Sequence, residues 1–313
     1  MALLLPCYRD ARRPRHILAE PKAVDQGRLL ILAKILAGVL GLVLLTALAA
    51  SAASGPVYQA PQAYYLALGD SIAYGIQPAK VNAGLPPSGF RTGYVDVFAA
   101  RLRALAPKIR VVNYGCPGES TKTFIDGRCP WLAEKRRLHD AFKGTQLGAA
   151  LAFLRAHPGQ VSPITLTLWG NDVFELFAPA CKDDLVCIRS HSRTGLARFS
   201  SRLSSIVGRL RAAAPKAEII LTGAWNFDVE HLAQTDPLFR SIDATIAWVA
   251  AAGKARVAKM YPVFSPVGNP ARTKARICAL TFICSKGDPH PKDAGYRAMA
   301  AAFLAASGYA HRS

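Results

Sequence analysis

The sequence predicts an α/β protein in which helices cover both faces of a five-stranded parallel sheet. Short apolar stretches alternate with amphipathic helical patterns along most of the chain, which is typical of such a sheet. The 313 residues are 51% hydrophobic and 19% charged, so the chain can bury a full core. No internal repeat or low-complexity linker interrupts the alternation, and one domain is therefore expected over residues 64–313.

Five short apolar stretches are the expected strands. They are 64–70, 109–115, 164–170, 217–223 and 255–261. The expected helices between and after them are 94–105, 144–156, 194–213, 239–252 and 293–306.

The first 53 residues differ in composition from the rest. Residues 1–28 carry six Lys or Arg against three Asp or Glu, and 29–53 is long and apolar enough for a signal peptide or a transmembrane anchor. The small residues in "ALAASAAS" favour cleavage, whereas the long basic region favours an uncleaved anchor, so both alternatives stay open. The basic region is expected to stay cytoplasmic. The protein is then secreted or membrane-anchored, with a linker at 54–63 and the domain from residue 64 extracellular.

The cysteines agree with export. Cys7 lies on the expected cytoplasmic side, and the other six form couples that are close in sequence. These couples are Cys116/Cys129, Cys181/Cys187 and Cys278/Cys284. Six cysteines allow 15 pairings, but neighbour pairing is the simplest, because each couple brackets one expected loop and the compartment is oxidising. No couple has the CxxC spacing typical of zinc sites and the seven histidines are scattered, so no metal is expected.

The charge balance restricts the partners. Of the 39 basic and 20 acidic residues, 7 and 3 precede residue 54, which leaves the remainder with a net charge of +15. Such a protein is expected to stay near an anionic membrane or cell-wall surface. It is also expected to be a monomer. A solvated basic surface without a specific polyanion site is the simpler alternative. No nucleic acid is expected, because the charges are dispersed and no binding motif accompanies them.

Polar residues follow several of the expected strands, at the edge where parallel sheets bind ligands. Ser71 follows the first strand, Gly118 lies in "NYGCPGEST" after the second, Asn171-Asp172 follows the third, and His290 lies in "GDPHP" after the fifth. Acyl transfer needs a nucleophile, a base and donors for an oxyanion, and these residue types can supply all three.

Each of these residues also has a purely structural interpretation. Ser71 can cap the helix that follows it, Asn171 can belong to a turn, and Gly118 can be needed only for its backbone freedom. His290 lies between two prolines in a rigid loop, which suits a base better than a core histidine.

Taken in order, four segments resemble the SGNH hydrolases, also called the GDSL esterase/lipase family. The matching segments are "GDS" at 69–71, "VVNYGCPGEST" at 111–121, "WGNDV" at 169–173 and "DPHPKDAGY" at 288–296. The resemblance covers about residues 64–306, and the six cysteines look like those of the secreted actinobacterial branch. The G-x-S-x-G turn of typical α/β-hydrolases is absent from the sequence.

The resemblance implies a flavodoxin-like three-layer α/β/α sandwich and a serine esterase or lipase without metal or cofactor. Ser71 is then the nucleophile, and His290 is the base that passes the proton to the leaving alcohol. The N–H groups of Ser71 and Gly118 and the side chain of Asn171 hold the oxyanion. Asp288 or a backbone carbonyl orients His290.

Two positions depart from the family pattern. The family usually has glycine two residues before the Asn, where this chain has Trp169, which either lines the acyl pocket or packs in the core. The family's Asp usually stands three residues before the His, where this chain has Gly287, and Asp288 stands two before. Asp293 is expected to cap the terminal helix, and Asp70 to brace the turn after the first strand.

The substrate stays open at this point. A lipid esterase or lipase acting on an acyl ester is favoured by the basic exported region and the apolar N-terminal segment. The second candidate is an O-acetyl esterase of cell-wall or plant polysaccharide. The third is a wall- or lipid-binding module that keeps the fold without catalysis, against which the complete set of Ser71, Gly118, Asn171 and His290 argues.

Overall fold

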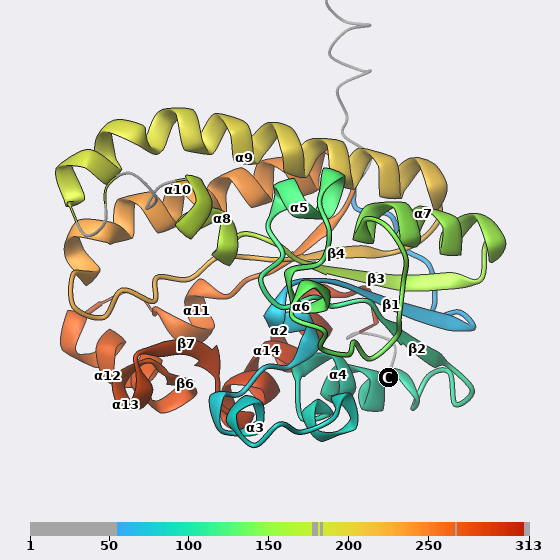
Figure 1. The fold of residues 1–313 in the computed structure, drawn as a ribbon. Coiled ribbons are helices and arrows are strands. Elements are labelled where there is room, and N and C mark those ends of the chain that lie inside the picture. The colour runs from blue at the N-terminus through green and yellow to red at the C-terminus, as the bar shows by residue number, and fades with distance from the viewer. Residues whose placement is uncertain (1–54, 177–180, 182–183, 267, 310–313) are drawn as a thin grey trace, which may run out of the picture. The chain divides into compact units, whose positions relative to one another are not determined.

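The centre of the protein is one sheet of five strands, seen in a computed structural model that describes residues 55–176, 181, 184–266 and 268–309 (Figure 1). The strand order is β2-β1-β3-β4-β5, and every neighbouring pair is parallel. The strands are β1 (Tyr64–Gly69), β2 (Arg110–Asn113), β3 (Val161–Thr167), β4 (Ile219–Thr222) and β5 (Arg256–Ala258). This is the order of flavodoxin-like folds, so the predicted fold class is confirmed.

The central strands are buried on both faces because helices cover both faces of the sheet. All seven residues of β3 are buried, as are the last five of β1. Continuous burial of this kind is typical of parallel sheets. Strand β3 begins and ends three residues earlier than predicted, because Leu168 and Trp169 are buried beyond the last sheet pairing rather than within it.

Helices lie above and below the sheet (Figure 1). One face carries α5 (Thr121–Asp126), α7 (Gln146–Ala156), α9 (Leu185–Ala213) and α10 (Leu232–Ala252), and the other carries α4 (Tyr94–Leu102) and α14 (Asp293–Ala306). Helix α9 begins earlier than predicted because Asp184 caps it, accepting bonds from the N–H groups of Val186 and Cys187. Helix α10 also begins earlier, since it runs through Pro237, a residue type that more often breaks a helix.

Short elements connect the strands. They are α2 (Ser71–Tyr74), α3 (Pro78–Asn82), η1 (Pro87–Phe90), α6 (Pro130–Ala133), α8 (Gly170–Leu176), α11 (Tyr261–Phe264), α12 (Pro270–Leu280), β6 (Thr281–Phe282), α13 (Ile283–Lys286) and β7 (Asp288–Pro291). Strands β6 and β7 pair antiparallel as a small second sheet, which holds the segment that contains His290.

The three disulfides join the couples that neighbour pairing predicts. They are Cys116–Cys129, Cys181–Cys187 and Cys278–Cys284. The first closes the loop after β2, the second lies at the start of α9, and the third ties α12 to α13. Disulfides are typical of proteins in oxidising compartments.

The expected linker, residues 54–63, is described from residue 55 onward, and this part is hydrogen-bonded to the domain. Residues 55–62 form no helix or strand, but the N–H of Val57 donates to the carbonyl of Lys254 at 3.0 Å and that of Gln62 to the carbonyl of Ser162 at 2.9 Å. The basic region 1–28 and the predicted signal or anchor at 29–53 lie outside the described residues. Within the part of the chain that the structure describes, no helix is both long and apolar enough to cross a membrane.

The predicted cap of α14 is wrong. Asp293 is the first residue of this helix, and Lys292 stands at the capping position without a side-chain cap bond. The Asp293 carboxylate instead accepts a 2.7 Å hydrogen bond from Nε2 of Gln77. Its charge still favours the helix start, but its contact ties α14 to the segment before α3.

Candidate active site

Ser71 is positioned by a tight passage from strand to helix. Gly69 ends β1 with φ +126°, and a Cβ there would lie 2.2 Å from the carbonyl oxygen of Thr167, so the position requires glycine. Asp70 caps α2, because its carboxylate accepts a bond from the N–H of Ile72 at 2.9 Å. The same carboxylate accepts the hydroxyl of Thr167 at 3.0 Å, which joins the turn to β3. Ser71 is therefore the first residue of α2 and not its cap, while Asp70 braces the turn.

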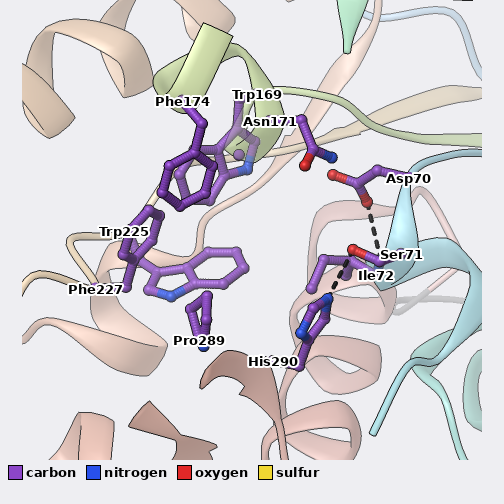
Figure 2. A pocket seen from close by; sticks show the side chains of 11 residues that line it. Asp70, Ser71, Ile72, Trp169, Asn171, Phe174, Trp225, Phe227, Pro289 and His290 are labelled. Atoms are coloured by element: carbon purple, nitrogen blue, oxygen red, sulfur yellow. Dashed lines mark hydrogen bonds between the residues drawn. The ribbon is translucent and has the colours of Figure 1, made fainter. Parts of the chain in front are cut away.

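His290 connects Ser71 to Asp288. Its Nε2 lies 2.8 Å from Oγ of Ser71 (Figure 2), and its Nδ1 lies 2.7 Å from Oδ1 of Asp288. The same Oδ1 accepts the backbone N–H of His290 at 2.8 Å. Burial alone would raise the pKa of Asp288, but the hydrogen bonds and the charge of His290 outweigh it and hold that pKa below its ordinary value. The structure thus forms a hydroxyl–imidazole–carboxylate chain in which a carboxylate contacts the imidazole.

Asn171 lines the same pocket as Ser71 and holds the loop that carries Gly118. Its Nδ2 donates a 2.9 Å bond to the carbonyl of Glu119, and the amide has a second hydrogen for a further acceptor. Gly118 is exposed and has φ +85°, a conformation that favours glycine. The N–H of Cys116 attaches the loop to the end of β1 at 2.9 Å. Asn171 is therefore placed at the pocket, and Gly118 on the loop attached to it.

A small pocket of about 70 Å³ separates Ser71 and His290 from a wall of aromatic side chains (Figure 2). The wall consists of Trp169, Phe174, Trp225 and Phe227. Trp169 is only 4% exposed and packs against the rings of Trp225 and Phe227. It therefore belongs to the core and to the pocket at once, so the two predicted alternatives are not exclusive.

A larger groove of about 480 Å³ adjoins the pocket. The two share Phe174, Phe227 and Pro289 as common walls. The other apolar residues of the groove are Val173, Leu185, Ile188, Val229, Leu238, Phe239 and Ile283. Its polar residues include Asp228, Glu230, His231 and Thr235. The sequence did not point to this groove. Its residues come from α8, the start of α9, the segment 227–231 with the start of α10, and α13 with the residues that follow it.

Glu119 is a buried acid whose only sequence signal is its place next to Gly118. Its Oε2 accepts a 3.1 Å bond from Nε2 of Gln146, while its Oε1 has no partner among the described residues. Gln146 in turn accepts from the N–H of Gly69 at 2.6 Å and donates to its carbonyl at 2.9 Å. Burial raises the pKa of Glu119 to about 7. The pair ties the Gly118 loop to the end of β1, and nothing in the sequence pointed to Gln146.

Asp172 fastens the start of α8. Its carboxylate accepts the N–H of Thr121 at 3.0 Å and also the hydroxyl of Thr121. Burial raises the pKa of Asp172 to about 6, and that of Asp70 likewise to about 6, although both carboxylates accept hydrogen bonds. By joining α8 to α5, Asp172 keeps the neighbouring Asn171 directed at the pocket.

Two clusters of the described residues bring metal-ligating side chains close together. They are Cys181, Cys187 and His191, and Cys116, Glu119 and Cys129. In each cluster the two cysteines are joined in a disulfide. Because metal sites use free thiolates, neither set of donors fits a metal ion.

Residues 67–298 match the GDSL-like Lipase/Acylhydrolase family. No curated protein matches the sequence. Among solved structures, phospholipase A1 from Streptomyces albidoflavus is 17% identical to this chain, with a TM-score of 0.53. The match covers 79% of this chain and 100% of the phospholipase chain. The extracellular lipase from Streptomyces rimosus is 17% identical with a TM-score of 0.52, covering 78% and 99%. An acetyl xylan esterase variant from Geobacillus stearothermophilus is 21% identical with a TM-score of 0.50, covering 80% and 96%. At these identities the likeness shows the fold alone.

Proposed function

Because the chain belongs to the GDSL-like lipase/acylhydrolase family, we propose that it is a serine hydrolase that cleaves carboxylic esters through an acyl-Ser71 intermediate. The observation that carries this proposal is the hydrogen-bonded chain of Ser71, His290 and Asp288. Its two links, 2.8 Å from Oγ to Nε2 and 2.7 Å from Nδ1 to Oδ1, are within the reach that a nucleophile and its general base need.

In the first half of the reaction, Oγ of Ser71 attacks the acyl carbonyl carbon while Nε2 of His290 takes the hydroxyl proton. The carbonyl oxygen becomes an oxyanion, which the N–H groups of Ser71 and Gly118 and Nδ2 of Asn171 stabilise. The bond to the leaving alcohol then breaks, and His290 gives its proton to the alcohol oxygen. In the second half, water loses a proton to His290 and attacks the acyl carbon, and the acid leaves as Ser71 regains its proton.

Asp288 orients the base in this mechanism. By accepting the hydrogen on Nδ1, it leaves the lone pair of Nε2 directed at Ser71. Its lowered pKa keeps the carboxylate ionised, so that its negative charge stabilises the imidazolium that forms during both halves. The carboxylate is thus proposed as the third member of the catalytic set in place of a backbone carbonyl.

The aromatic wall and the adjoining groove favour esters of longer fatty acids. An acyl group bound to Ser71 faces Trp169, Trp225 and Phe227, and the shared wall at Phe174 and Phe227 leads to the groove of about 480 Å³. A volume of this size is in the range that binds substantial ligands. We therefore favour a lipid ester as substrate.

A polysaccharide O-acetyl ester is the second candidate. The pocket beside Ser71 measures only about 70 Å³ and by itself suits a short acyl group. In that case the groove would hold the sugar part of the substrate, with Asp228, Glu230 and His231 as its polar contacts.

We further propose that the domain is exported and acts as a monomer near an anionic surface. The three disulfides support an oxidising compartment, and the net charge of +15 after residue 53 supports the surface.

Labelling with a fluorophosphonate probe tests the catalytic proposal. The wild type is expected to be labelled, Ser71→Ala not at all, and the matched variant Ser205→Ala, at an exposed serine of α9, as fully as the wild type. An unlabelled wild type would support an inactive binding module instead.

A series of p-nitrophenyl esters from acetyl to palmitoyl tests the substrate class. The ratio of kcat/KM for palmitoyl to that for acetyl is expected to exceed one. A sharp preference for acetyl would transfer the assignment to the O-acetyl esterase.

A further inference from the structure

A hollow outside the active site combines an aromatic floor with an exposed basic edge. It measures about 500 Å³ and lies between the α3–η1 segment and α6 with the residues that follow it. Tyr74 and Phe90 are buried at its floor. We call it the basic hollow and define it by Tyr74, Leu85, Phe90, Trp131, Lys135 and Arg137.

The edge of the basic hollow carries cations without acidic partners. The segment 128–137, "RCPWLAEKRR", contains four basic residues and one acid. That acid, Glu134, pairs with Arg136 at 3.1 Å. Lys135 and Arg137 are exposed, and neither forms an ion pair within the described residues. Lys135 also has φ +58°, a conformation that residues other than glycine seldom adopt. Two positive charges are therefore available to an anionic partner.

Exposed leucines accompany these charges. Leu85 lines the hollow and is 42% exposed, and Leu132, next to Trp131 on α6, is 37% exposed. Apolar side chains beside lysine and arginine are the pattern of surfaces that lie on anionic membranes, where the apolar groups enter the headgroup layer and the cations attract lipid phosphates.

The surroundings of Trp131 favour a membrane over a polysaccharide. Its indole N–H donates to the carbonyl of Arg137 at 3.2 Å, and the guanidinium of Arg136 lies over its ring, 4.5 Å from the centroid. Tyr74 packs against it at 5.7 Å. The ring therefore has one face and its polar group already occupied, which leaves little for stacking on a sugar but suits a side chain at a membrane interface.

We propose that the basic hollow docks this protein on an anionic phospholipid bilayer. Leu85 and Leu132 enter the headgroup layer, and Lys135 and Arg137 contact the lipid phosphates. Helix α6, which carries Trp131 of the hollow, neighbours the loop of Gly118, because Pro130 of α6 lies 3.1 Å from where a Cβ on Gly118 would stand. Docking there therefore brings the loop of Gly118 to the bilayer surface. This binding site is independent of catalysis.

Quenching of tryptophan fluorescence by brominated phosphatidylglycerol in phosphatidylcholine vesicles tests the contact directly. The full chain is used with Ser71→Ala, so that no lipid is hydrolysed and the result does not depend on the proposed reaction. The chain has four tryptophans, of which Trp169 and Trp225 are buried. Trp131→Phe is expected to remove most of the quenching, whereas Trp248→Phe, at a 63% exposed position of α10, leaves it unchanged. All variants keep residues 1–53, so binding through that region is the same in each.

A charge pair completes the test. Lys135→Ala with Arg137→Ala is expected to weaken the lipid-dependent quenching roughly 10- to 30-fold, at about a factor of five for each cation. Arg198→Ala with Arg209→Ala removes the same charge from exposed positions of α9 and is expected to weaken it less than about threefold. Equal weakening by both pairs, or quenching that persists in Trp131→Phe, would overturn the proposal. A response of Trp131 to soluble polygalacturonate but not to vesicles would assign the hollow to an anionic polysaccharide instead.

Discussion

Replacing Glu119 by glutamine is expected to change the way in which stability depends on pH. Glu119 is 1% exposed, and within the described residues one of its carboxylate oxygens accepts a hydrogen bond from Gln146 while the other has no partner. Burial raises its pKa from 4.5 to about 7. Glutamine has nearly the same shape as the protonated acid but does not titrate, so the substitution removes this ionisation without opening a cavity.

The sign and size follow from the two pKa values. The pKa of Glu119 is higher in the folded state, about 7, than the value of 4.5 taken for the unfolded state. Its contribution to the unfolding free energy is therefore fully present below about pH 4.5 and is lost as the pH rises through about 7. Each difference of one in pKa corresponds to about 1.4 kcal/mol. Between pH 5 and pH 9 the wild type is therefore expected to lose about 2.5 kcal/mol of unfolding free energy through Glu119, which Glu119→Gln does not lose.

Urea denaturation of both proteins at pH 5, 7 and 9 measures this difference. The unfolding free energy of the variant minus that of the wild type is expected to rise with pH. An unpaired amide hydrogen in the variant would shift all three differences equally, and Asp70 and Asp172 titrate in both proteins. The same substitution at the exposed Glu134 is expected to give a nearly constant difference. A constant difference for Glu119→Gln as well would refute the reasoning.

Three further outcomes concern catalysis. Asp288→Asn should lower kcat by roughly 10³- to 10⁴-fold, because an amide no longer holds the hydrogen on Nδ1 of His290. Asp293→Asn is the matched control, and an equal loss there in the hydrolysis of p-nitrophenyl butyrate would speak against the assignment. Asn171→Ala removes one oxyanion donor and should lower kcat about 10²- to 10³-fold with little change in KM, so an effect confined to KM would contradict that role. Phe227→Ala should lower kcat/KM for the palmitoyl ester at least about tenfold and for the acetyl ester by less than about threefold, since it removes apolar contact along the groove. Equal losses for both esters would show that the groove does not hold the acyl chain.

The site residues that could be predicted lie where local sequence alone decides their place. Ser71 and Asn171 lie a few residues after the ends of β1 and β3, and these strands are neighbours in the sheet. An apolar run that ends in polar residues identifies such positions without knowledge of the strand order. His290 required more, because three helices and β6 separate it from β5. Its two flanking prolines together with the family resemblance identified it.

The contacts that could not be predicted join segments far apart in the chain. Gln146 reaches Gly69 across 77 positions, and Gln77 reaches Asp293 across 216. A sequence pattern reports only periodicity and local turns, so it predicted that Asp293 caps a helix. In the fold, the carboxylate of Asp293 instead accepts a hydrogen bond from the side-chain amide of Gln77. The groove beside the pocket was missed for the same reason, since its walls meet only when the starts of α9 and α10 pack beside α13.

The unusual spacing of Asp288 and His290 has a local explanation. The family pattern has Asp three residues before the His, but here that position is Gly287, which ends α13 with φ +63° and so suits glycine. Asp288 stands two residues before His290, the spacing at which a carboxylate accepts the backbone N–H of a turn, and Oδ1 does so at 2.8 Å. The same oxygen then reaches Nδ1 of the ring at 2.7 Å. Pro289 and Pro291 fix the backbone on both sides of His290. Oδ1 of Asp288 therefore positions both the backbone and the imidazole of His290, which explains how the carboxylate works two residues before the His. The position three residues before the His, where the family has Asp, holds instead the glycine that ends α13.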